Sequence, residues 1–201
     1  MLEVTQVTEL HRTTVSLWHM REIANPYPDF LHVVCEQHKF NFLLWHEEDI
    51  ARSRQADDGQ IAAVKRAIDL YNQQRNDWIE KLDDYLLQAL AQHVFSGPPA
   101  RRLNTETPGS AIDRLSILAL RIYHMEEQAA RPDAAQEHRD KAEGRLAILH
   151  EQHRDLSNAL RELLDDIFAG RKRLKVYRQF KMYNDPTLNP YLYQSDQRRA
   201  G

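Results

Sequence analysis

Apolar side chains recur every three or four residues along most of the chain, which is the spacing of one buried face of an α-helix. In the longest periodic stretch this seam runs from Ile61 to Leu90, where Arg75 is a polar interruption. The periodicity predicts five helices. They span residues of about 8–24, 29–53, 60–92, 110–131 and 133–169.

Prolines, glycines and small polar residues separate the periodic stretches and mark where each helix begins and ends. Asp29 follows a proline-rich break and is expected to be the N-cap of the second helix. Two starts compete for the fourth helix. Either Ser110 caps it together with Asp113, or Thr107 is the N-cap and Pro108 takes the first helical position.

Long helices joined by short connections pack as antiparallel neighbours. The predicted fold is therefore all-α: an up-down antiparallel bundle of four main helices, with an additional N-terminal helix. Residues 1–170 would form this bundle domain. Residues 171–201 would form a basic, aromatic C-terminal tail, packed on the bundle or on a partner subunit.

The composition is that of a folded domain in water. Of 201 residues, 42% are hydrophobic and 28% are charged, a mix too apolar for disorder and too polar for a membrane protein. Cys35 is the only cysteine, so no intramolecular disulfide can form. The first nine residues lack the character of a signal peptide. These features predict a cytoplasmic protein.

Charge is unevenly distributed along the chain. Eight Lys/Arg and two Asp give residues 171–201 a net charge of +6, so within a total of −3 the remainder carries −9. Residues 171–183 combine six cations with three aromatic residues, which suits either docking on the chain itself or a nucleic-acid backbone. The acidic body favours self-docking or subunit contacts over nucleic acid.

Polar side chains follow one face of three helices and outline a first candidate site. His46 and Asp49 are three residues apart on the second helix and share a face. The other lines are Asn72, Asn76, Glu80 and Asp83 on the third helix, and Asp113, His124 and Glu127 on the fourth. If these lines converge, their carboxylates and imidazoles could bind a hard divalent cation such as Mg²⁺, or move a proton.

The candidate metal ligands in this set are His46, Asp49, Glu80 and Asp83. The alternative is that the polar lines are solvated and pair with basic side chains such as Arg52, Arg75 and Arg114, at about 0.2–0.5 kcal/mol each. P-loop, dinucleotide-binding, nucleophile-elbow and zinc-protease motifs are absent from the sequence. Catalytic residues are therefore not assigned.

A second candidate site precedes the fourth helix, where a helix N-terminus offers unpaired N–H groups and a partial positive charge. Thr107 and Ser110 add hydroxyls, and Gly109 allows a ligand to approach the backbone closely. Arg101 and Arg114 add charge, which completes a plausible phosphate or carboxylate cradle. A plain helix cap explains the hydroxyls equally well and leaves the arginines unexplained.

Three stretches carry a family resemblance: NFLLWHEEDIAR at 41–52, NQQRN at 72–76 followed by Ile79-Glu80, and LNTETPGS at 103–110 followed by IDRLSI at 112–117 and YHM at 123–125. Together they resemble the bacterial domain-of-unknown-function family numbered 4254, over nearly the whole chain including residues 175–185. The resemblance implies a bacterial, intracellular, helical protein without an assigned activity.

These features predict a protein that binds, and could hydrolyse, a small phosphorylated or otherwise anionic ligand. The ligand would lie between residues 101–114 and the polar faces of the second and third helices, with a divalent cation as a possible cofactor. The alternative is a non-catalytic scaffold that oligomerises through its helix faces and tail. A homo-oligomer is expected, and a membrane partner is not.

Overall fold

The computed structural model describes residues 3–95, 102–178 and 185–192. Within these ranges the regular structure is helical and no strand forms, so the all-α prediction is confirmed. The long helices are α1 (Val4–Trp18), α2 (Asp29–Ala51), α3 (Asp58–Ala91), α4 (Pro108–Ala130) and α5 (Gln136–Phe168). No helix among the described residues is both long and apolar enough to cross a membrane.

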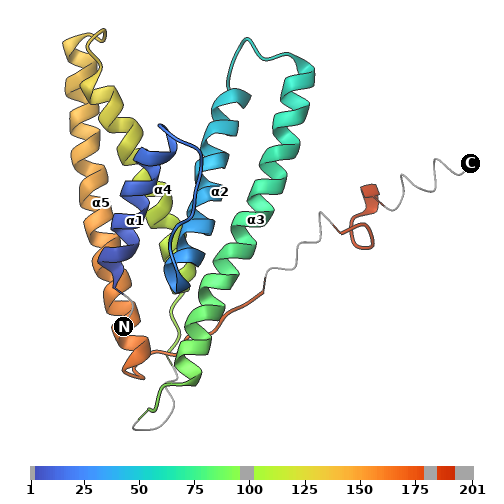
Figure 1. Cartoon of the computed structure of the whole chain (residues 1–201), viewed down its shortest axis with the longest axis vertical. Coiled ribbons are helices and arrows are strands. Elements are labelled where there is room, and N and C mark those ends of the chain that lie inside the picture. Colours follow the sequence, from blue (N-terminus) through green and yellow to red (C-terminus); the bar gives the residue numbers. More distant parts are fainter. Residues whose placement is uncertain (1–2, 96–101, 179–184, 193–201) are drawn as a thin grey trace, which may run out of the picture.

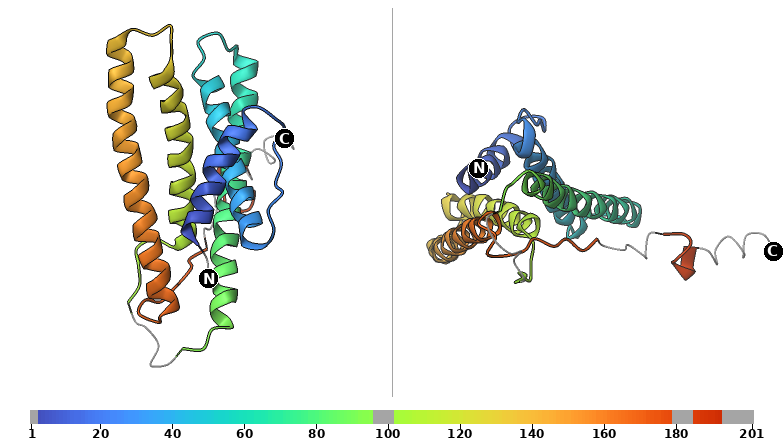
Figure 2. Two further views of the ribbon diagram at one scale, coloured as in Figure 1. Left: turned by 60° about the vertical axis from the view of Figure 1, so that its left-hand side comes forward. Right: turned by 90° about the horizontal axis from the view of Figure 1, so that it is seen from below.

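Two antiparallel hairpins, α2–α3 and α4–α5, form the body of the molecule and diverge as a V (Figure 1). α1 packs against α2, α4 and α5, and Figure 2 shows it bridging the two hairpins on one side. Along most of their length α3 and α5 do not pack against each other. Both hairpins of the predicted up-down bundle thus form, and α2 and α3 each pack against α4. The arrangement of all four helices as one bundle stays a prediction.

The main core explains why the hairpins meet at one end only. It is built from the apolar faces of α1, α2 and α4, with contributions such as Leu82 of α3 and Leu160 of α5 from the C-terminal halves of those helices. A separate small cluster of Leu44, Val64 and Ile68 joins α2 to the N-terminal half of α3. Since that half of α3 packs on α2 alone, the two hairpins are free to diverge there.

The helix starts decide between the predicted caps. Thr107 is the N-cap of α4 and Pro108 its first residue, and the Ser110 N–H donates to Thr107 Oγ1 at 3.2 Å. The predicted capping by Asp29 is wrong, because Pro28 is the N-cap of α2 and makes no side-chain cap bond. Asp29 opens the helix with a φ of 51°, in the left-handed region, so it is not placed as a cap.

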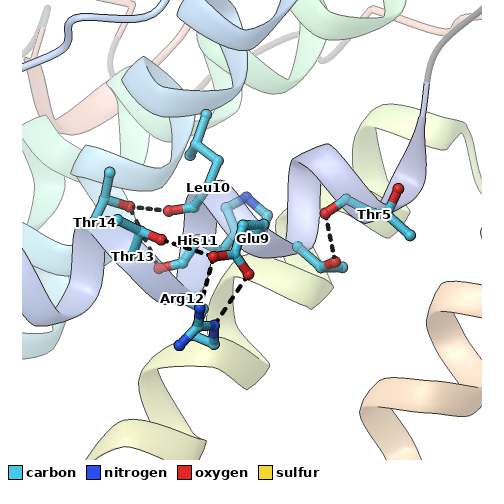
Figure 3. Close-up of polar contacts among 8 residues, drawn as sticks. Thr5, Glu9, Leu10, His11, Arg12, Thr13 and Thr14 are labelled. Atoms are coloured by element: carbon cyan, nitrogen blue, oxygen red, sulfur yellow. Dashed lines mark hydrogen bonds and ion pairs between the residues drawn. The ribbon is translucent and has the colours of Figure 1, made fainter.

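α1 begins earlier and ends earlier than the periodicity predicts. Val4 and Val7 are buried and extend the helix at its start, whereas Trp18 is its last residue. Its exposed face carries an ion pair in which Arg12 Nη2 lies 2.6 Å from Glu9 Oε1 (Figure 3). This early end places His19 just beyond the helix, at the C-cap position.

The described part of the tail contacts its own chain. The Arg173 N–H donates to the Arg102 carbonyl at 2.8 Å, and Leu174 packs against the main core. The Arg178 guanidinium pairs with Glu80 at 3.1 Å and with Asp84. Residues 179–184, which include Phe180 and Tyr183, lie outside the described residues. Contacts of the tail with a partner subunit stay a prediction.

Candidate functional site

A buried polar network joins α2 to α4. The Asp113 carboxylate accepts hydrogen bonds from Gln37 Nε2 at 2.6 Å and from Asn41 Nδ2 at 2.9 Å. Asn41 also donates to Ser116 Oγ at 2.8 Å, and this hydroxyl lies 2.7 Å from Nδ1 of His38. Because the network links one helix of each hairpin, it fixes the spacing of the helices beside it.

Arg75 approaches this network from α3. Burial raises the pKa of Asp113, whereas hydrogen bonds from Asn41, the positive charge of Arg75 and a hydrogen bond from Gln37 lower it. Arg75 Nε is buried and has no hydrogen-bond partner among the described residues, and Nη2 makes only a 3.4 Å bond to Asn76 Oδ1. A buried donor without an acceptor is costly, so this group suits an oxyanion ligand.

A cleft of about 400 Å³ opens beside Arg75, between α2, α3 and α4. We refer to it as the arginine cleft. Four of the predicted site residues line it, namely Asp49, Arg52, Asn72 and Arg75. Arg121 of α4 lines it as well, so three helices each contribute a guanidinium. Arg52 is paired with Glu48 at 2.9 Å, whereas the structure gives Arg121 no ion pair within the described ranges.

A second cleft of about 500 Å³ lies between α2, α4 and α5. It shares Trp45, Asp49 and Arg121 with the arginine cleft, and His124 and Arg145 also line it. The predicted residue His124 therefore belongs to the neighbouring cleft rather than to the arginine cleft itself. The two openings lie on either side of Trp45 and Asp49.

His46 and His124 approach each other from α2 and α4, and His19 joins them from the end of α1. The ring of His19 lies 5.1 Å from each of the other two rings, which are 6.0 Å apart, measured between centroids. Trp45 stacks on His124 at 4.7 Å and Tyr123 stacks on His19 at 4.3 Å. Three histidines distant in the sequence thus form one cluster held by aromatic neighbours.

The electrostatic setting of the cluster favours the neutral form of His46. Burial lowers the pKa of His46, and the nearby rings of His19 and His124 lower it further. The carboxylates of Asp49 and Glu127 oppose this effect without reversing it. Since the neutral imidazole is the form that donates a lone pair, the cluster presents a nitrogen ligand at neutral pH.

Asp83 and Gly109 meet at the start of α4, but as partners of each other. Asp83 Oδ1 accepts the Gly109 N–H at 2.8 Å, and the Asp83 side chain is only 2% exposed. Burial raises the pKa of Asp83, while hydrogen bonds from Thr107 and Gly109 lower it. The chain's own carboxylate thus occupies the position in which the predicted cradle would hold an anion. This corrects the predicted ligand contact at Gly109.

Thr107 and Ser110 line a different, smaller cleft of about 220 Å³, together with Arg173 and Lys175 of the tail. Arg114, a further predicted residue at this end of the molecule, forms an ion pair instead of lining that cleft. Arg114 pairs with Glu106 at 2.9 Å, and both are largely exposed. Arg101 lies outside the described residues.

The predicted oxygen-rich metal site does not assemble. Glu80 pairs with Arg178 at 3.1 Å, and Asp83 is engaged at the start of α4. His46 and Asp49 lie in the other half of the molecule, near the two clefts. The four candidates lie on faces that point to different neighbours, so a single cation could not reach all of them.

A family model described as a protein of unknown function, DUF4254, matches residues 31–176, from α2 to the beginning of the tail. The chain belongs to the DUF4254 family. This match is narrower than the predicted extent. It begins after α1 and ends at Val176, so residues 177–185 lie outside it. No curated protein and no solved structure matches the chain.

Within the DUF4254 segment lie His46, His124 and every residue lining the arginine cleft, whereas His19 precedes it. Sequence analysis missed His19 and Arg121. His19 falls at a helix end, where periodicity carries no signal, and its approach to α2 and α4 is tertiary. Arg121 lies on the fourth predicted helix, outside its predicted line of polar residues. Arg121 lies four residues after Ile117 and therefore on the same helix face. Because Ile117 lines the same cleft, this spacing is the signal that could have identified Arg121.

Proposed function

We propose that this DUF4254 protein binds a small anionic ligand, phosphorylated or carboxylate-bearing, in the arginine cleft. The supporting observation is that Arg52, Arg75 and Arg121 reach one cleft from three helices, with Arg75 Nε buried and lacking an acceptor. A guanidinium presents a planar fork of donors that matches phosphate and carboxylate oxygens. The sequence suggested a position between residues 101–114 and the polar faces of the second and third helices; the proposed position keeps those two faces and replaces residues 101–114 with Arg121 of α4.

Asp113 acts behind this cleft as a positioning group. Its carboxylate already accepts from Gln37 and Asn41, and its charge attracts Arg75. Asp113 thereby holds the guanidinium in a polar wall instead of leaving it to rotate in solvent. The proposed role of these residues is therefore recognition of the anion.

Calorimetric titration of the full chain with inorganic pyrophosphate tests the proposal. We expect Arg121→Ala to weaken pyrophosphate binding by about tenfold or more, because a charge-assisted hydrogen bond contributes about 1.5–3 kcal/mol. Arg121 is exposed and has no role in the core, so the variant should fold normally. Arg75→Lys keeps the charge but removes the fork, and it should weaken binding similarly.

The matched control is Arg66→Ala, which removes an exposed arginine of α3 that does not line the cleft. This variant should bind pyrophosphate as the unmodified chain does. Equal losses in Arg66→Ala and Arg121→Ala would indicate general charge attraction and would overturn the proposal. So would pyrophosphate binding that is unaffected by Arg121→Ala.

A bacterial origin and a cytoplasmic location belong to the same proposal. The single cysteine supports the location, because a chain with one cysteine cannot form the intramolecular disulfides typical of oxidising compartments. The alternative proposal is an oligomeric scaffold, which the exposed apolar side chains of Leu70 and Ile148 support. Sedimentation of the chain as a monomer at micromolar concentration would argue against the scaffold.

A further inference from the structure

The histidine cluster described above offers more than packed rings. His19, His46 and His124 each present one ring nitrogen, and these three atoms lie within 4.8 Å of one another. They come from three different helical segments, so their convergence is a property of the tertiary fold and not of one helix face.

The hydrogen bonds of the cluster leave specific nitrogens without partners. His19 Nδ1 lies 2.7 Å from the Val15 carbonyl, and His124 Nδ1 lies 2.9 Å from Glu127 Oε2. A carbonyl or carboxylate at this distance fixes the proton on Nδ1 and leaves the lone pair on Nε2. In both rings Nε2 is buried and has no hydrogen-bond partner within the described ranges.

We propose that His19, His46 and His124 form a binding site for a transition-metal ion of the Zn²⁺ class. Imidazole suits zinc, copper, iron and nickel, whereas Mg²⁺ prefers oxygen. Three protein ligands leave a fourth position for water or a bound molecule, as in open zinc sites. The site thus takes a softer ion than the Mg²⁺ that the carboxylate pattern suggested.

The arrangement also contains the outer partners that metal-binding histidines use. Metal-ligating histidines donate their second ring N–H to a carboxylate or a backbone carbonyl, which orients the ring. Glu127 has this position relative to His124, and the Val15 carbonyl has it relative to His19. Phe42, Trp45 and Tyr123 pack against the three rings and restrict their rotation.

Binding would require a small closure of the cluster. Zn–N bonds of about 2.1 Å at tetrahedral angles place two ligand nitrogens about 3.4 Å apart. The three nitrogens are at most 4.8 Å apart, so the rings need to approach by little more than an ångström. Small changes of the side-chain torsions within the present rotamers provide this movement without a change in the helices.

The competing explanation is that the three rings are simply aromatic packing residues between α1, α2 and α4. Packing would be satisfied by any flat ring of similar size, and it gives no reason for the directed bonds to the two Nδ1 atoms. The two explanations differ in one measurable property, which is whether a metal binds with defined stoichiometry.

Titration of the full chain with ZnCl₂ against a zinc-sensitive chelator tests the proposal. We expect one Zn²⁺ per chain. His46→Gln and His124→Gln should each lower the affinity for Zn²⁺ more than about 100-fold. Loss of a metal ligand should cost more than loss of an outer hydrogen-bond partner, which typically lowers metal affinity ten- to hundredfold. Glu127→Gln, which alters the outer partner of His124, should lower the affinity for Zn²⁺ by about ten- to hundredfold. Substituting Co²⁺ should give the intense visible absorption of a tetrahedral site, which packing alone would not produce.

The matched control is His150→Gln, which removes an exposed histidine of α5 outside the cluster. It should leave zinc affinity unchanged, and circular dichroism of each metal-free variant checks that it folds. Unaltered zinc affinity in both His46→Gln and His124→Gln would overturn the proposal, as would the absence of 1:1 binding. The titration contains no phosphate, so its result is independent of anion binding in the arginine cleft.

Discussion

Replacing Gly109 with alanine should lower the free energy of unfolding by about 3 kcal/mol, since overpacking costs roughly 1–3 kcal/mol and a disrupted buried hydrogen bond adds to it. A Cβ at this position would lie 2.8 Å from both Asp83 Oδ1 and the Ile79 carbonyl oxygen. The carbonyl belongs to the α3 backbone and cannot move without shifting that helix. Thermal unfolding should show a loss of about 6–12 °C in Tm.

Gly144→Ala is the matched control, because a Cβ there meets nothing within 4 Å. Gly144 lies inside α5, where glycine costs about 0.5–1 kcal/mol relative to alanine, so this variant should be more stable than the unmodified chain. Opposite signs for the two glycines are the expected outcome. A Gly109→Ala variant as stable as the unmodified chain would show that α4 does not approach α3 as closely as described.

Acid should destabilise the fold well before its surface carboxylates titrate. His38 is fully buried, and desolvation lowers its pKa from 6.5 to about 3. His11 packs against His38 with ring centroids 4.7 Å apart and the rings tilted by 33°, and burial likewise lowers the pKa of His11 well below 6.5. Between those values the unfolded chain binds protons that the folded chain does not, so stability falls as pH falls.

His38 alone should lower the free energy of unfolding by about 2 kcal/mol between pH 7.5 and pH 5, and His11 acts in the same direction. Asp83 and Asp113 act in the opposite direction, because burial raises the pKa of each and the folded state then binds protons more readily. The sharpest measure is therefore a difference between variants, obtained from urea unfolding at the two pH values.

His38→Gln removes the titrating group and should reduce the pH 7.5 to 5 stability loss by about 2 kcal/mol. His138→Gln removes an exposed histidine of α5 and should leave that loss unchanged. A similar acid response in both variants would mean that His38 is accessible to protons in the folded chain.

Helix positions could be predicted from the sequence because the signals are local. The α3 seam, the break around residues 25–28 and the Thr107-Pro108 start each lie within a few residues of the feature that they define. The divergence of the hairpins could not be predicted in this way. An apolar seam shows that a helix face is buried, but it does not identify the helix that covers it.

The candidate site was only partly predictable for the same reason. Asp49, Arg52, Asn72 and Arg75 share a cleft because α2 and α3 are sequence neighbours that pack along their length. Asp83 instead accepts a hydrogen bond from the N–H of Gly109, 26 residues away. A local sequence pattern does not show that a buried carboxylate finds its donor so far along the chain. His19 joins its partners only through the packing of α1.

The separation of α3 from α5 along most of their length has a mechanical consequence. α3 has 34 residues and is therefore about 50 Å long. Because α3 packs along α2, the two helices form one arm, and a tilt of a few degrees where this arm joins the core displaces its far tip by several ångströms. A ligand that widened or narrowed the clefts near the junction of the hairpins would therefore change the separation of the far helix tips by more than it changed the clefts.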